Sequence, residues 1–361
     1  MSEHICTLST GDRVYFYDKS IVIFFQGPRK VLSTSVYNGG YHEDYKAVYN
    51  YDGKQGSGMP CEMLADTYVG HMTLISERLA IDPQLVTGMA TAASMENAVV
   101  ETMSYQNLTV TAIVTGGIET NGGRVGDPAT YFHPVEKPGK AGTINIMLVL
   151  DTDMPPGTMA RALVTCTEAK TAAIQELLAG SNYSNGLATG SGTDQTIIVA
   201  NSESKLYLEG AGKHDKLGEL IGKTVKKAVK AALHKQAGLN PAKQHDVFRR
   251  LKRFGILPNL VWQEYQEQYA PTIKPVYLLA IEELGKEKMM LTYTSLYVHL
   301  LDQFLWQLID REELELAGQA VLDLLAEHYA TDRVTIDVAT VEGLLVGWKQ
   351  LFNSIVASKI A

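Results

Sequence analysis

The feature that most constrains the fold is a change of sequence pattern near Asn240-Pro241. Before this point, short runs of β-branched and aromatic residues alternate with stretches of helical spacing. After it, apolar residues recur at helical spacing with hardly any strand pattern. A chain of 361 residues is long for one domain and sufficient for two. The sequence therefore predicts two domains, residues 1–238 and residues 241–361.

The first domain combines strand and helix patterns. Leu108–Thr115 and Thr143–Leu150 are apolar runs typical of buried strands, and Thr196–Ala200 is a shorter one. Thr158–Leu178 and Lys216–Lys235 have helical spacing. Because strand, helix and strand follow one another between Thr143 and Ala200, we expect a crossover unit there. The predicted class is α+β, with a mixed α/β layered N-terminal domain followed by an all-helical C-terminal domain.

The second domain is predicted to be helical and to have an accessory role. Tyr293–Leu308, Arg311–His328 and Val338–Val356 are amphipathic, and Thr340 is a candidate cap for the last of them. Apolar stripes that include Phe304 either serve dimerisation or docking or form the core of this domain. A homo-oligomer is one of the expected states.

Composition excludes several classes of protein. Hydrophobic residues make up 45% and charged residues 20%, which is ordinary for a soluble globular chain. No apolar run approaches the roughly 18 residues that span a bilayer. The first twenty residues carry charges throughout, so no signal peptide is predicted. Three cysteines and nine dispersed histidines offer no metal-ligand spacing. We expect a cytoplasmic protein with no membrane partner, no metal site and no cofactor.

One basic band stands out in this acidic chain. Residues 213–253 hold twelve Lys or Arg against three Asp or Glu, a net charge of +9, whereas the whole chain carries −8. Such a band can bind nucleic acid. However, the lysines at 223, 226, 227 and 230 recur at helical spacing, which favours the solvent face of an amphipathic helix. We therefore predict no nucleic-acid partner.

The loop Ala188–Asp194 is the first candidate for chemistry. Its glycines, Gly190 and Gly192, let backbone approach a ligand closely, and N–H groups of such a loop can hold an oxyanion. Ser191 and Thr193 add hydroxyl groups. A glycine-rich turn before a strand also occurs for structural reasons alone.

Two further segments carry titratable side chains. Glu168 and Lys170 lie in the predicted helix Thr158–Leu178, among alanines and threonines. His214 comes just before the next helix, where it can act as a general base near neutral pH or lie on the surface.

Four blocks in order carry a family resemblance. They are Gly142–Ile146, Thr167–Ala173, Ala188–Asp194 and His214–Gly222. Together they resemble the adenosylcobinamide amidohydrolase family of corrinoid salvage. The resemblance covers roughly residues 20–235 and leaves the helical domain without an inherited role. In Thr91–Ala98 the chain departs from the family, which tends to have a glycine where Ala93–Met95 stands.

The resemblance implies a specific activity. Family members hydrolyse the amide that joins aminopropanol to a side chain of the adenosylated corrin ring, and the products are adenosylcobyric acid and 1-amino-2-propanol. The partner is then an adenosylated corrinoid, which brings its own cobalt as part of the substrate. Catalytic metal and cofactor are not implied. A non-catalytic corrinoid carrier or sensor, and a hydrolase of another amide, are the alternatives.

Amide hydrolysis needs a nucleophile, an oxyanion site and an acid for the leaving amine. Ser191 or Thr193 can attack or orient water, and Asp194 or His214 can act as base and then acid. Both direct water attack and an acyl-enzyme stay open. The substrate-binding candidates are Asn97, Asn145, Glu168, Lys170 and the backbone of Gly190 and Gly192.

Overall fold

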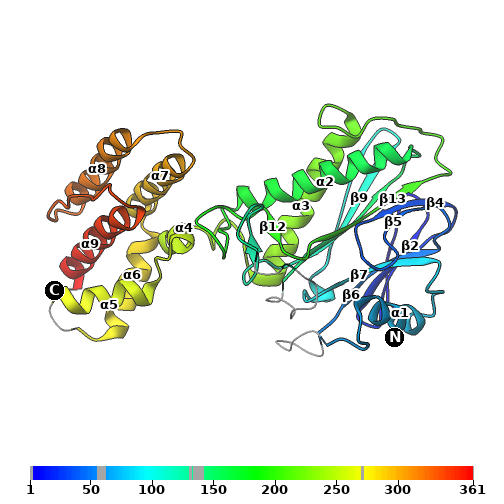
Figure 1. Cartoon of the computed structure of the whole chain (residues 1–361), viewed down its shortest axis with the longest axis horizontal. Helices are drawn as coiled ribbons and strands as arrows, with labels where there is room; N and C mark the ends of the chain where they lie inside the picture. The colour runs from blue at the N-terminus through cyan, green and yellow to red at the C-terminus, as the bar shows by residue number, and fades with distance from the viewer. Residues whose placement is uncertain (1–2, 55–61, 130–131, 133–141, 270–271, 361) are drawn as a thin grey trace. The chain divides into compact units, whose positions relative to one another are not determined.

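The computed structural model describes residues 3–54, 62–129, 132, 142–269 and 272–360 (Figure 1). The chain has an α+β fold and divides into two compact units. Unit 1 comprises Met1–Tyr183 and Leu187–Asn240, and unit 2 comprises Ser184–Gly186 and Pro241–Ala361.

Unit 1 contains two large sheets and a short ribbon. A six-stranded sheet has the order β5-β4-β13-β11-β9-β8, a five-stranded sheet has the order β1-β2-β3-β6-β7, and β10 pairs with β12. The strands are β1 Glu3–Thr7, β2 Arg13–Tyr17, β3 Ser20–Phe24, β4 Arg29–Ser33, β5 Gly40–His42, β6 Ala47–Asp52, β7 Val86–Thr91, β8 Val99–Tyr105, β9 Leu108–Gly116, β10 Gly122–Gly123, β11 Ile144–Leu150, β12 Gly190–Ser191 and β13 Gln195–Asn201.

Three helices and one 3₁₀ turn complete the part of unit 1 that the structure describes. They are α1 Tyr68–Arg78, η1 Met95–Asn97, α2 Pro156–Glu176 and α3 Lys216–Ala237. Helices α2 and α3 cover one face of the six-stranded sheet, as Figure 1 shows, and the five-stranded sheet packs on its other face. Helix α1 packs on the outer face of the five-stranded sheet. The unit is therefore built of four layers, two of them sheets.

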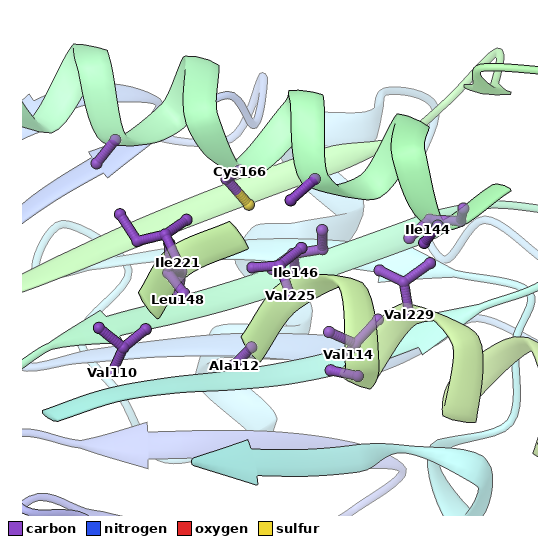
Figure 2. Packing of buried hydrophobic residues seen from close by; sticks show 14 of the residues in the cluster. Val110, Ala112, Val114, Ile144, Ile146, Leu148, Cys166, Ile221, Val225 and Val229 are labelled. Carbon is purple, nitrogen blue, oxygen red and sulfur yellow. The ribbon is translucent and has the colours of Figure 1, made fainter. Parts of the chain in front are cut away.

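Strand β11 is buried on both faces, which explains its unbroken apolar run. Ile144, Ile146 and Leu148 point toward α2 and α3, where Val225 and Cys166 meet them (Figure 2). Met147 and its alternate neighbours point toward the five-stranded sheet. Successive side chains of a strand point to opposite faces, so the apolar run of β11 contributes to the hydrophobic cores on both sides of the sheet.

The predicted crossover unit is confirmed. Strand β11 pairs in parallel with β13, and α2 lies between them in sequence. Pro156 occupies the first turn of α2, where a missing N–H costs nothing because it would lack an intrahelical partner. The crossover therefore begins at the end of β11 and returns the chain to the start of β13.

One predicted boundary is wrong. Helical spacing predicts a helix over Cys61–Leu79, but Cys61 lies outside the described residues and the helix begins at Tyr68. Thr67 caps it by accepting a hydrogen bond from the N–H of Gly70. Thr is a favoured N-cap residue because its hydroxyl satisfies an otherwise unpaired N–H, so the cap overrides the apolar spacing before it.

Helices joined by turns and loops make up the described part of unit 2, and strands are absent from that part. Its elements are α4 Val247–Leu251, η2 Lys252–Phe254, α5 Pro258–Gln268, α6 Lys274–Lys286, α7 Lys288–Leu305, α8 Arg311–His328 and α9 Val341–Ile360. The predicted cap is confirmed, because the Thr340 hydroxyl accepts from the N–H of Gly343 at 3.0 Å. The unit has its own apolar core, in which Leu344 and Trp348 are fully buried. Of the helices described in either unit, none has the length and apolarity needed to cross a membrane.

Candidate active site

Asp194 forms the centre of a charged cluster at the edge where β11 and β13 begin. Its carboxylate accepts from the N–H of Ile144 at 2.8 Å and from the N–H and hydroxyl of Ser191 at 3.0 and 2.6 Å. Lys170 Nζ, from α2, lies 2.5 Å from Asp194 Oδ2. The side chains of Lys170 and Asp194 are only 12% and 10% exposed. The fold therefore places a hydroxyl group and an ammonium group in contact with one carboxylate.

A glycine makes this cluster possible. The β10–β12 ribbon brings Gly190 against the Asp194 side chain. A Cβ atom at position 190 would lie 2.3 Å from Asp194 Oδ2 and 2.8 Å from Lys170 Nζ. Both distances are too short for nonbonded atoms, so the ion pair and any side chain at position 190 exclude each other.

We expect Gly190→Ala to lower kcat by about a hundredfold, because the added methyl group displaces the carboxylate by about 1 Å. Steady-state kinetics on folded protein measure the effect. Gly157→Ala is the matched control, because position 157 is exposed in the first turn of α2 and a Cβ there would meet nothing within 4 Å. Equal activity of the two variants would remove Asp194 from the reaction.

The hydroxyl of Thr193 is used differently from that of Ser191. Thr193 Oγ1 donates to the carbonyl oxygen of Gly142 at 3.0 Å, and Thr143 donates back to the Thr193 carbonyl at 2.8 Å. These bonds tie the loop before β13 to the segment before β11. Of the two candidate hydroxyls, only that of Ser191 is bonded to the Asp194 carboxylate among the described contacts.

Asn145 lies on the opposite face of the same sheet edge. It is fully buried, and its amide nitrogen donates to Asn50 Oδ1 at 2.8 Å and to the Ala90 carbonyl at 3.1 Å. Asn97 donates to Gln236 Oε1 at 2.9 Å, which ties η1 to the end of α3. Both predicted substrate-binding amides therefore also hold elements of the fold together.

The structure does not bring His214 to the Asp194 cluster. His214 precedes α3, whose first residue, Lys216, lies 4.5 Å from the ring of Tyr105. Tyr105 belongs to the sheet edge where β11 ends, whereas Asp194 bonds to Ile144, where β11 begins. His214 is exposed, and none of the contacts described for the chain joins it to Asp194, Ser191 or Lys170.

Glu168 also lies outside the cluster. It is exposed and pairs with Lys213 at 3.0 Å across a groove of about 570 Å³ between α2 and α3. Lysines of α3 are paired as well: Lys223 with Glu219, and Lys226 and Lys230 with Glu176. The basic face of α3 is thus an ion-paired surface.

Cys166 is buried in the core between α2 and the sheet. Burial raises the pKa of its thiol to about 12, and the nearby charge of Lys170 only partly offsets this effect. A thiolate is the nucleophilic form of cysteine, so this thiol is unreactive near neutral pH.

We therefore expect Cys166→Ala to keep kcat within about threefold of the wild-type value, because no step uses a protonated thiol. Kinetics and a thermal melt of the same preparation measure activity and folding together. Complete loss of turnover in a variant that melts normally would assign a chemical role to the thiol.

Across the parts of the chain that the structure describes, no group of three or more His, Cys, Asp or Glu side chains is placed to hold a metal ion. The carboxylate of Asp194 is instead occupied by Lys170 and by hydrogen-bond donors.

Two comparisons relate the chain to known proteins. The family model described as adenosylcobinamide amidohydrolase matches residues 5–241. An uncharacterized protein of Methanocaldococcus jannaschii is 32% identical over 233 residues, which is 60% of this chain and 87% of the relative. The family match contains the whole Asp194 cluster and ends where unit 2 begins.

Proposed function

Because this chain belongs to the adenosylcobinamide amidohydrolase family, we propose that it hydrolyses the aminopropanol amide of adenosylcobinamide. The products would be adenosylcobyric acid and 1-amino-2-propanol, in salvage and remodelling of corrinoids. The family match over residues 5–241 carries this proposal. The charged cluster at the sheet edge supports it, because amide hydrolysis needs proton transfer and charge stabilisation in one place.

We assign the proton transfers to Asp194. Amide resonance makes the carbonyl a poor electrophile, so the attacking oxygen must lose its proton as the bond to carbon forms. The Ser191 hydroxyl donates to Asp194 Oδ1 at 2.6 Å, which is the geometry for such a transfer. In this proposal Asp194 receives the proton and then returns it to the nitrogen as the C–N bond breaks. His214 is not assigned this role because it is exposed and has no described contact with Ser191 or Asp194.

Lys170 has an electrostatic role in this scheme. Its ammonium group contacts Asp194 and offsets the cost of burying a carboxylate there. The backbone N–H of Gly192 stands next to Ser191 in an exposed turn and has no hydrogen-bond partner among the described contacts. We assign it to the oxyanion that develops on the carbonyl oxygen.

The identity of the attacking oxygen distinguishes two versions of the scheme. Either Ser191 attacks and an acyl-enzyme forms, or Ser191 orients a water molecule that attacks directly. Ser191→Ala abolishes the first route and slows the second. Rapid mixing with adenosylcobinamide reveals a burst of aminopropanol only if an acyl-enzyme accumulates.

Incubation of the full chain with adenosylcobinamide tests the proposal. Liquid chromatography with mass spectrometry should detect adenosylcobyric acid and aminopropanol in equal amounts. Tight binding of the corrinoid without either product would favour a carrier or sensor. If the protein neither binds adenosylcobinamide nor forms product from it, the assignment of this substrate is refuted.

A further inference from the structure

Two buried oxygen atoms without a described hydrogen-bond partner belong to neighbouring side chains that face the five-stranded sheet of unit 1. Asn145 Oδ1 and Gln195 Oε1 are buried and have no hydrogen-bond partner among the described residues. Asn145 and Gln195 are register partners on the parallel strands β11 and β13, so they point to the same face. Neighbouring strands lie about 4.8 Å apart, so the two side chains leave the backbone at positions about that far apart. Leaving such atoms unpaired is costly.

The surrounding contacts fix the orientation of the Asn145 amide. Its nitrogen donates to the Ala90 carbonyl, which can only accept, and to Asn50 Oδ1. Asn50 is held in turn, because its own nitrogen donates to Thr115 Oγ1 at 2.8 Å. The amide of Asn145 therefore cannot rotate to hide its oxygen. Asn50 is a positioning residue that keeps Asn145 Oδ1 available.

Gln195 is the more accessible residue of the pair, although its Oε1 atom is itself buried. Its side chain is partly exposed, whereas Asn145 is fully buried. Tyr68 lies on the other side of Gln195 and accepts from the N–H of Ala90 at 3.2 Å. Burial raises the pKa of Tyr68, and hydrogen bonds with Ala90, Gln195 and Ser35 lower it in part. The phenol is therefore neutral at physiological pH.

We propose that Asn145 Oδ1 and Gln195 Oε1 together accept the two N–H bonds of one primary carboxamide of the substrate. This inference rests on the proposed function, since a corrin ring carries such carboxamides at its periphery. The groups around the pair are neutral: Asn50, Thr115, Tyr68 and the Ala90 carbonyl. A neutral surrounding favours a neutral donor over an ammonium ion, whose buried charge would need a partner.

The same two oxygens select against a carboxylate. A carboxylate offers no N–H and would place a negative charge against two acceptors. The pair would thus distinguish a corrinoid with its carboxamides intact from one whose carboxamides have been hydrolysed. A site whose acceptors need a donor rejects a ligand that lacks the donor far more strongly than an apolar pocket rejects a ligand that lacks one methylene group.

Gln195→Met tests the proposal, because methionine has a similar shape and lacks the acceptor oxygen. We expect KM for adenosylcobinamide to rise by roughly three- to tenfold with kcat little changed, as expected for one lost hydrogen bond. Gln195→Glu keeps an acceptor oxygen and should recover part of the loss. Thr224→Val is the matched control, because Thr224 Oγ1 is also buried without a partner but lies in α3, away from the sheet edge.

A modified corrinoid completes the test. The probe is a corrinoid with peripheral carboxamides hydrolysed to carboxylates, used as a competitor. It should bind the wild-type protein at least tenfold more weakly than the intact corrinoid, and Gln195→Met should reduce this preference. If wild-type protein hydrolyses adenosylcobinamide and Gln195→Met leaves KM and the preference unchanged, the carboxamide proposal is wrong by itself. If wild-type protein neither binds nor hydrolyses the corrinoid, the proposed function fails first.

Discussion

Asp194→Asn should lower kcat by a factor on the order of 10²–10⁴, the usual contribution of a positioned acid–base group. The substitution keeps the shape of the side chain and removes the charge that accepts the proton from Ser191. Corrinoid binding should be largely retained, because the assigned proton transfer occurs after binding. Steady-state kinetics together with equilibrium binding measure the two effects separately.

Glu176→Gln is the matched control for this substitution. Glu176 lies on α2, as Lys170 does, and pairs with Lys226 at 2.8 Å on the surface. Its loss also removes an ion pair from the helix but touches no part of the cluster, so kcat should stay near the wild-type value. Normal turnover by Asp194→Asn, combined with inactivity of His214→Ala, would reassign the proton transfer from Asp194 to His214.

Asp12→Ala should lower the free energy of unfolding by about 3–5 kcal/mol, the cost of leaving a buried charge without its partner. Asp12 is 0% exposed and Arg29 is 1% exposed. Asp12 accepts from Arg29 Nε at 2.8 Å and also from the N–H of Gln26 and the hydroxyl of Thr10. Urea unfolding of the full chain, followed by far-ultraviolet circular dichroism, measures the change.

This ion pair joins the two sheets of unit 1. Arg29 is the first residue of β4, in the six-stranded sheet, and its guanidinium also donates to Asn201 at the end of β13 at 3.0 Å. Asp12 stands just before β2, in the five-stranded sheet. As a control, Arg78→Met removes an exposed pair with Asp18 and should cost less than about 1 kcal/mol. Equal losses for Asp12→Ala and Arg78→Met would contradict a structural role for the buried pair.

The local parts of the fold were predictable from sequence. The unbroken apolar run of β11 indicates burial on both faces, and the Thr340 cap and the helices around it follow from spacing and cap chemistry. Strand partners were not predictable in the same way. Residues 30–37 follow the β2–β3 hairpin in sequence, yet β4 pairs with β13 and β5 in the other sheet. The paired residues of β4 and β13 are 164 to 172 positions apart in the sequence, and pairing over such a separation leaves no local signal.

The sequence indicated which residues form the candidate site better than it indicated which of them contact one another. Asp194, Ser191 and Lys170 meet as neighbours. Glu168 and Lys170 are both substrate-binding candidates, but residues two apart on a helix point to nearly opposite sides of it. The structure accordingly places Glu168 in the groove with Lys213 and Lys170 at Asp194. This separation follows from helical geometry and could have been predicted.

Gln195 and Asn50 had no sequence signal. Gln195 follows the candidate loop as the first residue of an ordinary strand, and Asn50 is a single polar residue in a buried one. Only the register of β11 with β13, and the packing of the two sheets, bring their amides to Asn145. Contacts of this kind depend on tertiary structure, so composition and periodicity carry no trace of them.

The most direct test of the account is hydrolysis of adenosylcobinamide in water enriched in oxygen-18, with mass spectrometry of the corrinoid product. The account predicts adenosylcobyric acid with one oxygen-18 in its new carboxyl group, formed by wild-type protein and almost abolished by Asp194→Asn. Unchanged adenosylcobinamide after prolonged incubation with folded wild-type protein would contradict it.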